Sequence, residues 1–173
     1  DILQKHNVKA AFFLVGNYMQ TNPDLVRRMV AEGHIVGNHT MHHPDMSKIS
    51  DPTAFQKELE ELESLYRDTT GREMPKYYRP PQGTYSRENL KMAQNLGYKT
   101  VFWSLAYKDW EKDVVKGADY AVKEVVDHIH NDGLCLLVIH ALHYLRSVVR
   151  TAVGDGLRKL NVANGIVDLV LVN

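Results

Sequence analysis

The chain has 173 residues, of which 44% are hydrophobic and 24% charged, and its 21 basic side chains equal its 21 acidic ones in number. This length suits one domain with a proper core and is short for two, so we expect a single domain over residues 1–173. The balanced charge argues against a nucleic-acid-binding protein, and no apolar run approaches the roughly 20 residues of a membrane-spanning helix.

The first residues predict that the protein continues upstream of Asp1. The chain begins without Met, in a segment (Ile2-Leu3-Gln4-Lys5-His6) that is typical of the end of a helix. We therefore expect a missing N-terminal segment, and the lack of a targeting sequence says nothing about the protein's destination.

Apolar runs alternate with helical patterns along the rest of the chain. The expected strands are residues 10–15, 35–37, 77–79, 100–104, 134–139 and 166–172. The expected helices are residues 22–33, 51–68, 86–96, 120–130 and 147–160, with Asn22 and Ser86 as N-caps. Strands that alternate with helices predict an α/β fold with a parallel sheet.

The chain has one cysteine, Cys135, in the middle of the apolar run at residues 134–139. We interpret it as a packed thiol in a strand rather than a catalytic nucleophile. A single cysteine cannot form an intrachain disulfide, so the redox compartment stays open.

Two histidines four positions apart, His39 and His43, follow the expected strand at residues 35–37. Imidazoles that converge from one short turn can share a metal ion, but a catalytic ion needs about three protein ligands and an open position for water. The third ligand is not evident in the sequence. Because the chain has nine histidines, the pair alone leaves metal binding and chance spacing both open.

Further polar clusters also follow expected strands, and in closed α/β barrels the carboxyl ends of the strands form one catalytic mouth. The clusters are Arg79-Pro80-Pro81-Gln82-Gly83, Asp109-Trp110 and His140. Each cluster has a plainer interpretation: a surface ion pair and a tight turn for the first, a solvated loop with a core tryptophan for the second, and a hydrogen-bonded core histidine for the third.

Taken together, the motifs resemble those of the polysaccharide deacetylases, the NodB-homology enzymes of carbohydrate esterase family 4. The matching segments are His39-Thr-Met-His-His43, Tyr78-Arg79-Pro-Pro-Gln-Gly83, Trp103-Ser-Leu-Ala-Tyr-Lys-Asp109-Trp110 and the apolar strand ending at His140. Their order and spacing agree with the family's second to fifth motifs over about residues 1–140. Within the family, Ala106 and the segment from Lys116 to Ala121 are most similar to sporulation peptidoglycan deacetylases that prepare muramic δ-lactam.

The resemblance implies a distorted, incomplete (β/α) barrel that lacks its first strand in this chain. It implies a hydrolase that removes N-acetyl groups from peptidoglycan, works outside the cytoplasm and uses a divalent metal ion, with zinc expected. His39 and His43 would bind the ion, Arg79 would orient a carboxylate base, and His140 would be the general acid with Asp109 beside it. The implied substrate contacts are Pro80, Pro81, Gly83, Tyr85, Trp110 and Leu137.

Two departures from the family pattern leave alternatives open. The family's first motif, which supplies the base and a metal-binding Asp, should precede residue 1, and the segment after His140 lacks the polar run common in the δ-lactam type. His143 therefore competes with His140 for the acid role. The alternative functions are a non-catalytic glycan-binding remnant of the same fold and a chitin or xylan deacetylase.

Overall fold

The computed structural model describes residues 1–5, 9–103, 105–106, 123, 127, 135–138 and 166–171. The chain forms two compact units, one of residues 1–11 and 103–170 and the other of residues 12–102 and 171–173. The single domain expected from the chain length stays a prediction. His39, His43 and Arg79 all belong to the second unit.

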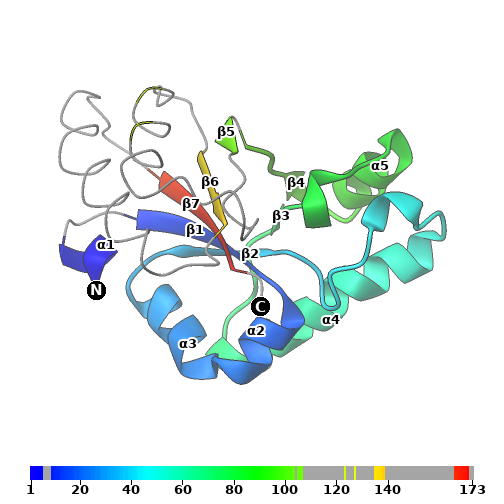
Figure 1. The fold of residues 1–173 in the computed structure, drawn as a ribbon. Coiled ribbons are helices and arrows are strands. Elements are labelled where there is room, and N and C mark those ends of the chain that lie inside the picture. Colours follow the sequence, from blue (N-terminus) through cyan, green and yellow to red (C-terminus); the bar gives the residue numbers. More distant parts are fainter. Residues whose placement is uncertain are drawn as a thin grey trace. The chain divides into compact units, whose positions relative to one another are not determined.

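The elements alternate along the chain as expected for an α/β protein (Figure 1). The strands are β1 (Lys9–Leu14), β2 (Ile35–Asn38), β3 (Tyr77–Tyr78), β4 (Lys99–Thr100), β5 (Leu105–Ala106), β6 (Cys135–Val138) and β7 (Ile166–Leu171). The helices are α1 (Ile2–Lys5), α2 (Gly16–Thr21), α3 (Pro23–Ala31), α4 (Pro52–Thr70) and α5 (Arg87–Asn95), with 3₁₀ helices at Met46–Lys48 and Pro81–Gly83.

The strands within each unit run parallel. In the second unit β2 pairs with β3, placing Asn38 opposite Tyr78, and β3 pairs with β4. In the first unit β5, β6 and β7 are paired in the same way. The predicted parallel α/β fold is confirmed. Because β2 and β3 are parallel neighbours, the residues after Asn38 and after Tyr78 emerge at the same edge of the sheet.

Helix α4 supplies much of the core of the second unit. Its apolar stripe, predicted from helical spacing, is buried at Phe55, Leu59, Leu62 and Tyr66. The helix begins where the Asp51 carboxylate accepts a hydrogen bond from the Thr53 backbone N–H, and it ends at Gly71 in the left-handed region, where glycine is favoured. Helix α4 contacts α2, α3 and α5 (Figure 1), so its position is fixed by packing on several sides.

The elements differ from the expected ones in three places. Helix α2 was not predicted, because its six residues carry too little apolar periodicity to stand out. The strand expected at residues 100–104 is confirmed only at Thr100, because β4 covers Lys99–Thr100 and residues 101–103 lie outside any strand. Ser86 caps α5 as predicted, but Asn22 does not cap α3 through its side chain, which instead donates to the carbonyl of Tyr18.

Most of the helices expected at residues 120–130 and 147–160 lie outside the described residues. Within the described part of the chain, no helix combines the length and apolar character needed to cross a bilayer.

Candidate functional site

The two predicted metal ligands lie on a short turn, residues His39–His43, which we call the His turn. The turn starts directly after β2 and is anchored in the sheet, because the His39 N–H donates to the carbonyl of Leu14 over 3.1 Å. A second hydrogen bond links the start of the turn to the segment after β3, because the Arg79 N–H donates to the carbonyl of Asn38 over 2.9 Å. Two of the predicted motifs are therefore brought together at one edge of the sheet.

The backbone of the His turn is bent by residues in an unusual conformation. Thr40 has φ 72° and His43 has φ 57°, both in the left-handed region that non-glycine residues seldom adopt. The Asn38 side-chain oxygen accepts from the Thr40 N–H at 2.9 Å, and the Thr40 hydroxyl accepts from the His43 N–H at 3.0 Å. These side-chain hydrogen bonds hold the turn in its bent form and set the direction of both imidazoles.

The imidazoles of His39 and His43 lie close together, with ring centroids 4.9 Å apart and ring planes at 68°. His39 is 3% exposed, and its Nδ1 lies 2.8 Å from the carbonyl oxygen of Arg79. Because a carbonyl can only accept, Nδ1 carries the proton and Nε2 keeps a free lone pair. Burial lowers the pKa of His39 to about 3 and also lowers that of half-buried His43, so both rings are neutral at physiological pH.

This arrangement fits a divalent metal ion. Two imidazoles that bind one tetrahedral ion through bonds of roughly 2.0–2.1 Å have ring centroids about 5 Å apart, which is the spacing of His39 and His43. A metal-binding histidine commonly donates its other ring N–H to a carbonyl, as His39 does to Arg79. Among the described residues no third His, Cys, Asp or Glu completes a metal-binding group with them.

Arg79 is buried beneath the site. Its guanidinium carbon lies 4.3 Å from the centre of the Phe13 ring, and its Nε and Nη2 donate to the carbonyls of Val101 and Phe102 over 3.3 and 3.5 Å. Burial lowers the pKa of Arg79 to about 9, which still leaves it charged at neutral pH. A charged donor fixed beside the His turn is compatible with the predicted role of orienting a carboxylate, which stays a prediction.

The loop after Arg79 is compact and partly exposed. Pro80 and Pro81 are buried, and Gln82 and Gly83 have positive φ angles of 57° and 69°. Tyr85 is 58% exposed and packs the edge of its ring on Phe102, with centroids 5.0 Å apart. The prolines thus shape the loop from inside, while Tyr85 is the predicted substrate residue with a ring open to solvent.

Asp45 joins the His turn to this loop, and it was not predicted from the sequence. Its Oδ1 accepts from the Ser47 N–H at 3.1 Å and from the Thr84 hydroxyl at 3.0 Å, while Lys48 pairs with Oδ2. Hydrogen bonds from Ser47 and the pair with Lys48 lower the pKa of Asp45 to about 2. An Asp two residues before a Ser is a common local turn pattern, so the hydrogen bond from Ser47 could have been predicted from the sequence. The hydrogen bond from the distant Thr84 could not.

Gly16, at the start of α2, packs directly beneath the His turn. Its N–H lies 3.1 Å from the carbonyl oxygen of Met41, and a Cβ at this position would come within 2.5 Å of that backbone oxygen and 2.4 Å of the Met41 sulfur. No larger residue fits there unless the turn moves. Gly16 is therefore a second support that was not predicted from the sequence.

Several predicted site residues cannot be placed. Asp109, Trp110, His140 and its rival His143 lie outside the described residues, and Leu137 is described only by its backbone in β6. Their predicted roles stay predictions.

Comparisons with known proteins identify the fold and the family. The model of the polysaccharide deacetylase family matches residues 1–101. The solved structure of PdaA from Bacillus subtilis, a family 4 carbohydrate esterase, matches with a TM-score of 0.86 and 32% identity over 97% of this chain and 70% of that one. The α/β fold predicted from the sequence is therefore that of these esterases.

Several curated relatives carry named activities, among them the following two. The peptidoglycan-N-acetylmuramic acid deacetylase PdaA of Bacillus subtilis is 41% identical over 138 residues, which are 79% of this chain and 52% of that protein. A chitooligosaccharide deacetylase of Bradyrhizobium is 36% identical over 137 residues, 79% of this chain and 61% of the relative. The chain spans about half the length of the first of these relatives. Since the family model covers more than half of the chain, the protein belongs to the polysaccharide deacetylase family.

Proposed function

We propose that the full-length protein is a metal-dependent N-deacetylase of peptidoglycan glycan strands, with muramic acid as the sugar it acts on and zinc as its metal. The observation that carries the proposal is the pair of neutral imidazoles 4.9 Å apart, of which His39 is oriented by its hydrogen bond to the Arg79 carbonyl. Membership of the polysaccharide deacetylase family supports the reaction type.

The chemistry assigns a task to each part of the site. His39 and His43 would hold the ion, which supplies a Lewis acid for the acetamide carbonyl and for the attacking water. Arg79, buried and charged, would orient the carboxylate that takes the proton from that water. That carboxylate and the third metal ligand would come from the family's first motif.

The amide nitrogen needs a proton before it can leave as an amine. We assign this step to His140, with Asp109 favouring its charged form, because histidine can carry a proton near the working pH. Trp110 and Leu137 would line the pocket for the acetyl methyl group. The exposed ring of Tyr85, after the buried prolines, is suited to contact a sugar face beside the site.

The choice of muramic acid rests on the higher identity to the muramic acid deacetylase, 41%, than to the chitooligosaccharide deacetylase, 36%. Chitooligosaccharide deacetylation is therefore the second candidate. Because peptidoglycan lies outside the cytoplasmic membrane, we place the protein in the cell envelope or the medium.

Acetate release by the full-length protein tests the proposal. The protein is incubated with zinc and either defined peptidoglycan strands or chitooligosaccharides, and acetate is quantified with and without a chelator. We expect release from the muramic acid of peptidoglycan, abolished by the chelator and restored by zinc. Release only from chitooligosaccharides would support the second candidate, and no release from either substrate would refute deacetylation.

A further inference from the structure

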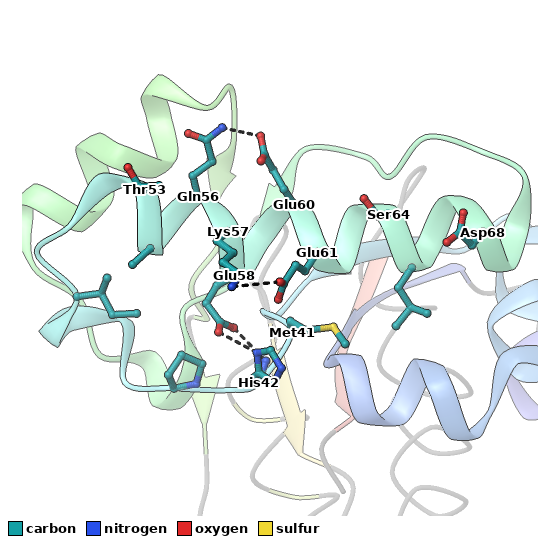
Figure 2. A pocket seen from close by; sticks show the side chains of 14 residues that line it. Met41, His42, Thr53, Gln56, Lys57, Glu58, Glu60, Glu61, Ser64 and Asp68 are labelled. Carbon is teal, nitrogen blue, oxygen red and sulfur yellow. Dashed lines mark hydrogen bonds and ion pairs between the residues drawn. The ribbon is translucent and has the colours of Figure 1, made fainter.

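Glu58, in the middle of α4, contacts the His turn at three points, of which Figure 2 shows the two made by its carboxylate to His42. Its backbone carbonyl accepts from the Met41 N–H at 3.0 Å, and its carboxylate Oε2 accepts from the His42 N–H, also at 3.0 Å. The other carboxylate oxygen, Oε1, accepts from Nδ1 of His42 at 2.9 Å. One glutamate therefore holds both residues at the centre of the turn, between His39 and His43.

The position of Glu58 is itself well fixed. The next residue, Leu59, is fully buried, and its backbone carbonyl accepts from the Asn38 side chain at 2.9 Å. The Glu58 side chain is 17% exposed, while that of His42 is 63% exposed. The carboxylate is thus presented from the well-packed helix, and the His42 ring is the more exposed partner of the pair.

We propose that Glu58 is a positioning residue for the metal site: its carboxylate clamps His42, and the clamp fixes the turn that presents His39 and His43 to one ion. The inference rests on the proposed metal-binding role of these two histidines. Glu58 touches neither the ion nor the substrate in this proposal, so its effect passes through the backbone of the turn.

The same helix offers a matched control. Glu61 lies almost one turn further along α4, is 40% exposed and pairs only loosely with Lys57, with 3.7 Å between Oε1 and Nζ. Glu61→Ala changes charge and helix propensity in the same way as Glu58→Ala but leaves the His turn untouched.

The test compares Glu58→Ala, Glu58→Gln and Glu61→Ala in the full-length protein. Zinc affinity is measured by chelator competition, the absorption spectrum is recorded with Co²⁺ in place of zinc, and amide hydrogen exchange is followed in the metal-free protein. In Glu58→Ala we expect roughly tenfold weaker zinc binding, the lower end of the loss typical for supporting residues around a metal. We also expect an altered Co²⁺ spectrum and faster exchange at the amides of Met41 and His42.

Glu58→Gln should restore near-wild-type values, because its amide oxygen can accept from the His42 N–H and its NH₂ can donate to the ring in its other tautomer. Glu61→Ala should bind zinc within twofold of the wild type. Unchanged zinc affinity and Co²⁺ spectrum in Glu58→Ala would overturn the proposal, and so would an equal loss in Glu61→Ala. A wild-type protein that binds zinc but releases no acetate would refute the proposed function and leave the role of Glu58 intact.

Discussion

The inner and outer sides of the His turn use the same residue type in opposite ways. On the inner side His39 is 3% exposed, neutral, and directed by one hydrogen bond to the Arg79 carbonyl. On the outer side His42 is 63% exposed and pairs with the carboxylate of Glu58. Burial, rather than the short sequence motif, therefore decides which histidine is suited to bind a metal.

The environment around each ring follows the same division. Inside, Asn38 and Thr40 are fully buried, and their polar atoms bond to specific partners within the turn and on α4. Outside, the Lys57–Glu61 pair of α4 is exposed to water, where such pairs contribute little. Substitutions on the inner side should therefore cost more than equivalent ones outside.

The largest expected difference is in metal binding. His39→Gln removes a proposed ligand, so we expect zinc affinity to fall by more than the roughly 10–100-fold typical of a supporting residue. His42→Gln keeps its backbone N–H on Glu58 and should stay within a few-fold of the wild type. Chelator competition measures both. Equal losses in the two variants would contradict the distinction between the inner and outer rings.

A smaller effect is expected on stability from Asn38→Ala. The substitution removes the bond to the Thr40 N–H and leaves the Leu59 carbonyl and the Tyr98 hydroxyl without their Asn38 partner. We expect the free energy of unfolding in urea to drop by about 2 kcal/mol, within the range for buried polar groups that lose partners. The exposed Asn95, substituted in the same way, should change it by less than about 0.5 kcal/mol. A loss at Asn38 no larger than at Asn95 would argue against a tightly held turn.

Taken per pH unit, the smallest effect is the pH dependence of stability on the inner side. The folded-state pKa of His39, about 3, lies below the unfolded value of about 6.5, so the unfolded chain takes up a proton more readily. This residue's contribution to stability is fully present above about pH 6.5 and is lost as pH falls from there toward 3.

The corresponding slope approaches about 1.4 kcal/mol per pH unit below pH 6. The His39 contribution is isolated by comparing the urea unfolding of the chelator-treated wild type with that of His39→Gln at several pH values, because the other histidines are common to both proteins. Parallel pH profiles for the two would show that His39 is not buried as a neutral ring.

Local patterns were enough to predict several features of the site. The apolar run that became β1 and the buried stripe of α4 depend on neighbouring residues alone. Parallel strands then required that His39 and Arg79, each just after a strand, meet at one edge of the sheet.

Other features depend on partners that no local pattern announces. Glu58 reaches His42 across 16 positions, and Asn38 reaches Tyr98 across 60. The two positive φ angles in the His turn occur at Thr and His, residues that carry no glycine signal for such a conformation. These contacts and backbone angles arise from tertiary packing. Local sequence predicts where a motif lies along a strand, and tertiary packing determines how its side chains are oriented.

The close approach of Gly16 to Met41 also bears on how variants of this protein should be interpreted. In a saturation mutagenesis library selected for activity, position 16 should tolerate almost no replacement, although it precedes the first of the paired histidines by 23 positions. A ranking of variants by their distance along the chain from the histidines would pass over it. Because a Cβ at this position would lie 2.5 Å from the backbone carbonyl oxygen of Met41, the shape of the His turn depends on a glycine far from it in the sequence.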